Sequence, residues 1–212
     1  MGLYIKEIWR YPVKSMAGEQ LERANISAQG IEGDRVVLVR NNGRVVTART
    51  HPALLGHRGA TGYDGTPMVD GRPWMQPDVL ADIRGIAGPQ VQLIQSDTNN
   101  RFDILPLLVA TDGAIREFGR DGRRLRPNLV IGGVDGLEER TWPGRHLRIG
   151  DVIIRLDSLR GRCIVTTYDP QTGEHDPSVL QDIVARFRGK LAINSAIEQG
   201  GLIHVQQPVE LL

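Results

Sequence analysis

Residues 35–47 read RVVLVRNNGRVVT. Two short β-branched runs flank the Asn41-Asn42-Gly43 segment, and this pattern is typical of two antiparallel strands joined by a tight turn. Further short apolar runs follow along the chain, at residues 3–8, 91–94, 107–110, 129–131 and 151–156. Because these runs do not alternate regularly with helical patterns, a doubly wound parallel sheet is disfavoured. The sequence therefore predicts an α+β fold that is predominantly β and barrel-like.

Helical periodicity is clearest between Asp176 and Arg188. Asp176 is predicted as the N-cap and Pro177 as the first helical residue, and the apolar positions that follow share one face of the helix. Earlier in the chain, residues 59–89 are rich in glycine and proline, which indicates loops, small elements and a domain boundary. We therefore expect a smaller N-terminal β-rich region at residues 1–95 and a second domain at residues 96–212.

The composition indicates a globular protein with no strong overall charge. The 212 residues include 26 Lys+Arg and 25 Asp+Glu, so the whole chain has no charge excess that would favour nucleic acid or an anionic membrane. No apolar stretch approaches the ~20 residues that span a bilayer, and the amino terminus lacks the apolar core of a secretory signal. A single cysteine excludes an internal disulfide. We expect a cytoplasmic protein that binds neither nucleic acid nor membrane.

That single cysteine, Cys163, lies in the segment LRGRCIVTTYDP at residues 159–170. Arg160 and Arg162 stand within three residues of it, and nearby cations favour the thiolate, which is the form that ligates metals or attacks electrophiles. A β-branched run and then a turn signal follow, so we expect the cysteine at the mouth of a strand. Free cysteines also serve as small buried hydrophobic residues, and the local sequence leaves both interpretations open.

Two basic motifs in the first fifty residues suit an anion. Lys14 and Ser15 follow a predicted strand and a proline, and together they offer one point charge and one neutral donor. The segment GIEGDR at residues 30–35 contains two glycines that permit close backbone approach, and Arg35 adds a planar fork for phosphate. Each motif is equally compatible with an ordinary solvated loop or a surface ion pair.

A third basic motif precedes the strand predicted at residues 129–131. Pro127 disfavours the helical region for Arg126, so we expect Arg126 to be extended. On an extended backbone, Arg126 and Asn128 point to the same side and present a guanidinium and an amide to one place. The five histidines, in contrast, show no metal-binding spacing, and the chain contains no nucleotide-type phosphate loop or multiple-cysteine metal motif.

Four stretches together resemble the MOSC family, named after the molybdenum cofactor sulfurase C-terminal domain, in the order and spacing of its mitochondrial amidoxime-reducing branch. They are residues 11–15, 30–35, 126–128 and 161–173. The resemblance covers essentially the whole chain and implies a MOSC fold preceded by the family's N-terminal β-barrel. It implies that Cys163 is the catalytic molybdenum ligand. It also implies that the molybdenum cofactor, a molybdopterin, is held by Lys14, Ser15, Arg35, Arg126, Asn128, Gly161 and Arg162.

The sequence departs from the amidoxime-reducing branch at a few positions. Ile104 and Leu105 stand where hydroxyl residues precede the proline that matches Pro106. Gly161 replaces a serine two residues before the ligand cysteine, and Asn194 occupies a position that is aromatic in some relatives. The resemblance also includes weaker matches at residues 47–49 and 102–106. These departures concern the substrate more than the cofactor.

The resemblance implies a molybdenum-dependent oxidoreductase that reduces N-hydroxylated or related N-oxide and S-oxide small molecules. Its electrons would come from a separate electron-transfer protein or reductase, since the sequence contains no further redox motif. Two alternatives remain open: a sulfur carrier or sulfurtransferase with a persulfide on Cys163, and a cofactor-binding module without turnover. Sulfur transfer in the wider family is associated with pyridoxal phosphate binding. The sequence leaves the substrate and the oligomeric state undetermined.

Overall fold

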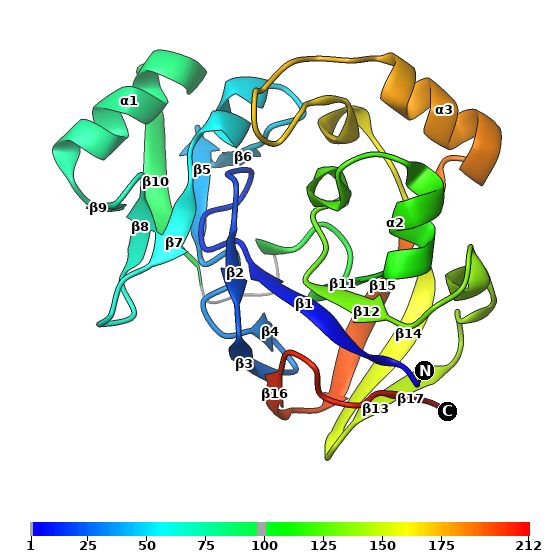
Figure 1. The fold of residues 1–212 in the computed structure, drawn as a ribbon. Coiled ribbons are helices and arrows are strands. Elements are labelled where there is room, and N and C mark those ends of the chain that lie inside the picture. The colour runs from blue at the N-terminus through cyan, green and yellow to red at the C-terminus, as the bar shows by residue number, and fades with distance from the viewer. Residues whose placement is uncertain (1, 97–100) are drawn as a thin grey trace.

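The largest sheet runs through both halves of this computed structural model, which describes residues 2–96 and 101–212 (Figure 1). Within those residues its strands are β1 (Tyr4–Arg10), β2 (Glu19–Leu21), β11 (Leu107–Thr111), β12 (Leu129–Gly132), β13 (His146–Ile149), β14 (Val152–Gly161), β15 (Lys190–Gln199) and β17 (Glu210–Leu211). Their order is β17-β13-β14-β15-β11-β12-β1-β2. The β11–β12 pair is parallel, and the other pairs are antiparallel.

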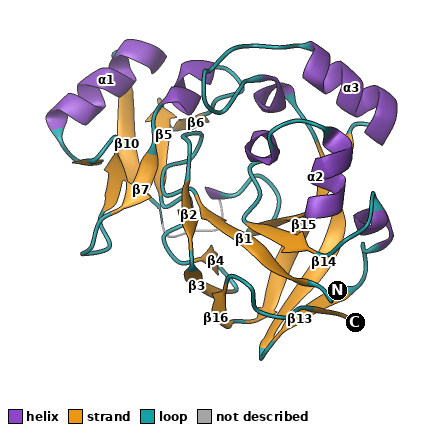
Figure 2. Ribbon diagram, viewed as in Figure 1, coloured by secondary structure: helices purple, strands orange, loops and turns teal. Residues whose placement is uncertain are grey.

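Three smaller sheets accompany the large one in the described residues. They are β10 (Val91–Gln95) with β5 (Val37–Asn41) and β6 (Arg44–Val46); β16 (Gly201–His204) with β3 (Arg23–Ser27) and β4 (Gly30–Ile31); and β7 (Gly59–Thr61) with β8 (Pro67–Val69) and β9 (Arg72–Pro73). The α-helices are α1 (Pro77–Ala87), α2 (Asp112–Phe118) and α3 (Ser178–Phe187), and Figure 2 shows α1 beside β10, away from α2 and α3. Short 3-10 turns lie at η1 (Pro52–Gly56), η3 (Gly122–Leu125), η4 (Glu138–Thr141) and η5 (Ile164–Thr167).

The predicted fold class is confirmed, because strands prevail and do not alternate regularly with helices. The predicted hairpin is present as the antiparallel pair β5–β6. At its turn, Asn42 and Gly43 have φ angles of 48° and 77°, a backbone region that asparagine and glycine tolerate best. The predicted C-terminal helix is also present, but it begins at Ser178, with Pro177 as N-cap. Asp176 lies before it and accepts a hydrogen bond from the Ser178 amide at 3.0 Å.

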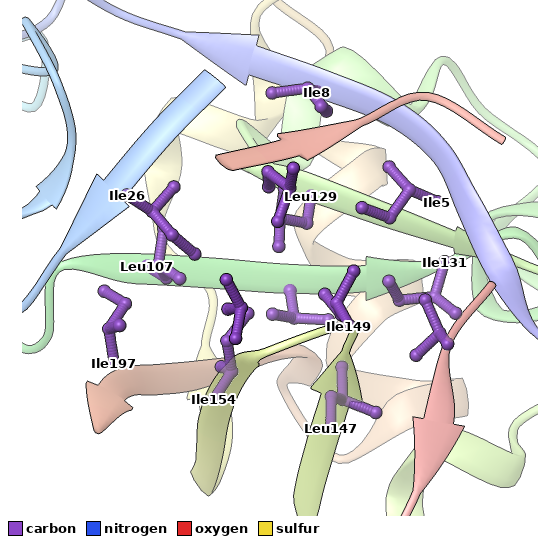
Figure 3. Packing of buried hydrophobic residues seen from close by; sticks show 14 of the residues in the cluster. Ile5, Ile8, Ile26, Leu107, Leu129, Ile131, Leu147, Ile149, Ile154 and Ile197 are labelled. Carbon is purple, nitrogen blue, oxygen red and sulfur yellow. The ribbon is translucent and has the colours of Figure 1, made fainter. Parts of the chain in front are cut away.

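The main hydrophobic core lies between the large sheet and the β3–β16 pair. Figure 3 shows its isoleucine and leucine side chains, which come from strands in both halves of the chain and include Ile5, Ile26, Leu129 and Ile154. A second core, which includes Val37 and Ile83, lies under α1, and a third packs α2 and α3 against the region around η3. The contribution of each core to the stability of the fold grows with the apolar surface area that it buries.

The N-terminal strand is part of the sheet that the C-terminal half builds. β1 pairs antiparallel with β12, and β3 pairs with β16. Tyr4 forms a bridge with Pro208, which brings the two chain ends close together (Figure 1). The domain division at residues 95 and 96 stays a prediction. Among the described residues, none of the helices combines the length and the apolar character needed to cross a membrane.

Candidate functional site

A cleft collects residues from at least six separate segments of the chain. Its walls come from the loop after β1, the segments after β4 and β6, residues 102–108, the η3–β12 connection and the end of β14. The cleft brings together all eight residues predicted from sequence: Lys14, Ser15, Arg35, Arg126, Asn128, Gly161, Arg162 and Cys163. Its lining carries one lysine and five arginines against a single carboxylate, so the cleft favours an anionic ligand.

Cys163 is a free, half-buried thiol immediately after β14. The sequence predicts the cysteine at the mouth of a strand, and β14 does end two residues before it, but the β-branched residues 164–167 that follow form the 3-10 turn η5 and not a strand. Two hydroxyls explain the difference: Thr166 donates to the carbonyl oxygen of Cys163 at 2.8 Å, and Thr167 donates to that of Ile164 at 2.6 Å. Such local bonds compete with strand pairing. The thiol is therefore at the end of a strand, on the wall of the cleft.

Arg49 interacts directly with Cys163. Burial by itself would lower the pKa of Arg49, but a side-chain hydrogen bond with Cys163 and the negative charge of Asp103 outweigh it and raise the pKa. Arg162, which the sequence places next to the cysteine, also interacts electrostatically with it. In the sequence, Arg49 appears only in the weaker family match at residues 47–49.

Asp103 links three of the cleft's cations. Its carboxylate accepts from the Lys14 ammonium at 2.8 Å, from the Arg49 guanidinium at 2.6 Å and from the Arg160 guanidinium at 3.1 Å. Burial would raise the pKa of Asp103, but the hydrogen bond and charge of Lys14, with the charges of the two arginines, lower it to about 2. Asp103 was absent from the predicted site, because its partners lie on segments that are distant in sequence.

The depressed pKa of Asp103 has a consequence for acid stability. An ionised Asp103 stabilises the fold above its ordinary pKa of 3.8, and this stabilisation is lost as the pH falls toward about 2. In Asp103→Asn we expect a smaller loss of thermal stability between these two pH values than in the wild type. Melting temperatures measured across that interval test this, and parallel curves for the two proteins would contradict it.

The Lys14–Ser15 motif is anchored at the edge of the cleft. Lys14 donates to the Arg101 carbonyl oxygen at 2.8 Å as well as to Asp103. Ser15 has a φ of 73°, and its hydroxyl oxygen accepts a hydrogen bond from the Ala48 amide at 3.0 Å. Since that oxygen acts as an acceptor, the hydroxyl proton of Ser15 is left for a ligand.

Arg35 and Asn128 are held in place by the fully buried carboxylate of Asp34. Arg35 forms an ion pair with Asp34, and the Asn128 amide donates to it at 3.2 Å. The third donor to Asp34 is the Tyr11 amide, at 2.7 Å. A buried carboxylate needs such partners, because an unpaired buried charge is strongly unfavourable. These bonds therefore fix the Arg35 and Asn128 side chains where they line the cleft.

Arg126 differs from the sequence prediction in its backbone. It is left-handed, with φ 55° and ψ 48°, because its amide closes η3 by donating to the Arg123 carbonyl oxygen. Its guanidinium lies over the Tyr11 ring at 4.3 Å, and in the part of the chain described here its side chain has no hydrogen bond to protein. Burial lowers the pKa of Arg126 to about 10, so it stays charged at neutral pH. It still lines the cleft with Asn128.

Arg162 has one nitrogen bonded and two unsatisfied. Its Nη2 donates to the Leu125 carbonyl oxygen at 2.7 Å, whereas Nε and Nη1 are buried and without a partner among the described residues. Burial also lowers the pKa of Arg162 to about 10. Unsatisfied buried donors are costly in a folded protein, so two of them on a cationic side chain beside a cleft indicate a missing anionic acceptor.

Two further residues belong to the cleft. Arg160 donates to the Asn194 side-chain oxygen at 3.3 Å, and Asn194 donates to the carbonyl oxygen of Ser158 at 3.3 Å. His175 lies outside the cleft, where its ring stacks on Tyr168 with the centroids 4.6 Å apart.

Two protein-family models match this chain. The MOSC N-terminal beta barrel domain matches residues 2–75, and the MOSC domain matches residues 112–210. The chain belongs to the MOSC family. The resemblance inferred from four short motifs is thereby confirmed over both segments.

Relatives of this MOSC protein include mitochondrial amidoxime reducing component 2 of Macaca fascicularis, 27% identical, with 87% of this chain and 72% of the relative aligned. Mitochondrial amidoxime-reducing component 1 of Homo sapiens is also 27% identical, over 98% of this chain and 82% of the relative. Among solved structures, the YUAD protein of Bacillus subtilis has a TM-score of 0.55 at 13% identity, covering 100% of this chain and 96% of that one. This last likeness concerns the fold alone.

The MOSC cleft fits a large anionic group that brings its own metal. Within residues 2–96 and 101–212, two buried donors of Arg162 and the Arg126 side chain have no protein acceptor, and a phosphate with about two negative charges would satisfy them. Cys163 supplies one soft thiolate ligand. Among residues 2–96 and 101–212, no three His, Cys, Asp or Glu side chains are grouped to hold a metal ion.

Proposed function

We propose that this protein is a molybdenum-cofactor oxidoreductase that reduces N-hydroxylated or related N-oxide and S-oxide small molecules. The observation that carries the proposal is the thiol of Cys163 beside Arg49, on the wall of a cationic cleft in which Arg162 has two buried donors without a partner among the described residues. The similarity to the amidoxime-reducing components supports the same class of substrate. We also propose a cytoplasmic location.

Each residue of the cleft has a defined task in this proposal. Cys163 would ligate the metal, and Arg49 would hold the thiol in place on the wall of the cleft. Arg126 and Arg162 bind the phosphate of the cofactor, while Asp34 and Asp103 orient the remaining cations through their ion pairs. The bound cofactor supplies the two-electron oxygen-transfer chemistry.

The reaction requires an external source of electrons. Reduction of an amidoxime to an amidine breaks the N–O bond, consumes two electrons and two protons, and releases water. The electrons come from a separate electron-transfer protein or reductase. Within the described residues, the chain's own redox-active side chain is the one thiol, which the proposal uses as a metal ligand.

The decisive experiment is a metal and pterin analysis of protein purified from a host that makes the cofactor. We expect molybdenum and pterin in equal amounts, and turnover of an amidoxime with a chemical reductant. Absence of both metal and pterin, with Cys163 intact, would contradict the proposal. A reducible mass gain of one sulfur at Cys163 would instead identify a sulfur carrier, and bound cofactor without turnover from any donor would identify a binding module.

Removing the charge of Arg126 tests the phosphate site. Because this side chain has no hydrogen bond to described protein atoms, Arg126→Met should leave the fold intact and weaken cofactor retention by about 1.5–3 kcal/mol, or roughly 10- to 100-fold. Cofactor content after extended dialysis is the measurement. Arg44→Met, at an exposed arginine on β6, is the control and should retain cofactor as the wild type does. Equal retention by both variants would remove Arg126 from the site.

A further inference from the structure

A second cavity adjoins the cleft. Three residues line both spaces: Leu55, Arg126 and Val165. Val165 lies in η5, two residues after Cys163 in the chain. The remaining wall of the second cavity includes three aromatic residues, Trp9, Tyr11 and Tyr168, together with Pro170 and small or basic residues. We call this space the aromatic cavity.

Apart from Arg126, which lines both spaces, the polar groups of the aromatic cavity are engaged within the protein. The Trp9 indole donates to Glu7 at 2.7 Å, and the Tyr11 hydroxyl donates to the Pro127 carbonyl oxygen at 3.1 Å. The two arginines on its wall are held by carboxylates: Arg123 by Asp121 at 2.6 Å and Arg124 by Asp169 at 2.9 Å. Apart from the Arg126 guanidinium at the boundary with the cleft, the cavity offers a ligand ring and aliphatic surface.

The aromatic walls are also fixed in orientation. The Tyr168 ring is supported from one side by the stacked His175 ring. Tyr11 is fully enclosed, and burial raises its pKa to about 12, so it presents a neutral ring at physiological pH. Rigid rings with their polar atoms occupied bind planar apolar groups, which gain from burial and from stacking. An extended anion such as the cofactor gains more in the cationic cleft next to it.

We propose that the aromatic cavity binds the planar apolar body of the substrate while the N–O group of the same molecule lies in the cleft near Cys163. This inference rests on the proposed function for the N–O group, but the cavity itself is independent of it. In this arrangement the cleft binds the charged cofactor, and the aromatic cavity determines which substituent of the substrate is preferred. Substrates with an aromatic ring are preferred over substrates with a small alkyl group.

Two variants change the cavity in opposite ways. Trp9→Ala removes a ring from its wall, and Ala17→Phe, at a half-buried position that lines the cavity, fills the space. The probes are benzamidoxime, which carries a phenyl ring, and acetamidoxime, which carries a methyl group. We expect KM for benzamidoxime to rise about tenfold or more in both variants, with kcat little changed and acetamidoxime little affected. Trp74→Ala, at a half-buried tryptophan that lines neither space, is the matched control.

A binding measurement separates this inference from the proposed function. Titration with benzamidoxime in the absence of any reductant should quench the tryptophan fluorescence of the wild type and of Trp74→Ala, but not of Trp9→Ala. If this quenching is seen and neither amidoxime is reduced, the cavity stands and the proposed function fails. The inference would be overturned if both amidoximes lost activity equally in the two variants, or if benzamidoxime did not quench the fluorescence of the wild type. Reduced cofactor content in Trp9→Ala and Ala17→Phe would also overturn it, because the cavity would then belong to the cofactor.

Discussion

Cys163→Ser is expected to abolish metal-dependent turnover and to leave the fold unchanged. The side chain is half-buried at the end of β14, and a serine fits the same space. The hydroxyl, however, is a harder ligand than a thiolate and remains protonated beside Arg49. Loss of groups that merely orient a metal ligand costs about 10- to 100-fold, so loss of the ligand itself should exceed about 100-fold.

The measurements for Cys163→Ser are the steady-state rate, the molybdenum content and the melting temperature of the same preparation. We expect a melting temperature within the range of ordinary surface substitutions and a rate below detection. A variant that unfolds, in a protein whose wild type never holds molybdenum, would mean that Cys163 is a packing residue. A variant that keeps both metal and rate would exclude Cys163 as the ligand.

Glu139→Ala is expected to destabilise the whole fold by about 3 kcal/mol or more. Glu139 is fully buried in η4, and its carboxylate accepts three hydrogen bonds: from the amide and hydroxyl of Thr111, at 3.1 and 2.9 Å, and from the amide of Ala192, at 2.8 Å. These bonds join η4 to β11 and β15 and hold Ala192 at a φ of 66°. Alanine leaves all three donors buried without an acceptor.

Denaturant unfolding measures the loss in Glu139→Ala, and the control is Glu138→Ala, at the exposed neighbouring glutamate of the same turn. The control should remain within about 0.5 kcal/mol of the wild type. Glu139→Gln should fall between the two, because glutamine retains only one acceptor oxygen. If Glu139→Ala matched the control, the buried carboxylate would have no structural role.

The raised pKa of Glu139 also predicts a pH dependence of the free energy of unfolding. Burial raises the pKa of Glu139 above its ordinary value of 4.5, so the folded chain binds this proton more tightly than the unfolded chain does. The free energy of unfolding therefore falls as the pH rises through the interval above 4.5. In Glu139→Gln this contribution to the pH dependence is absent, which the same unfolding measurements at several pH values detect.

Much of the cleft could be predicted from sequence because its parts are local motifs. Lys14-Ser15, Arg126-Pro127-Asn128 and Gly161-Arg162-Cys163 are each contiguous, and their order along the chain matched a family pattern. The backbone around them was less predictable. Arg126 is left-handed rather than extended, and the segment after Cys163 is a 3-10 turn rather than a strand, because single hydrogen bonds to neighbouring residues outweigh local propensity.

The sequence alone determined the β-rich fold class, the β5–β6 hairpin and which residues could form an anion site around one thiol. These features depend on residue type and on spacing over a few positions. Only the tertiary structure decided that Arg49 contacts Cys163, that Asp103 joins Lys14, Arg49 and Arg160, and that an aromatic cavity opens beside the cleft. Such contacts join segments tens of residues apart, and their geometry exists only once the sheets and cores have packed.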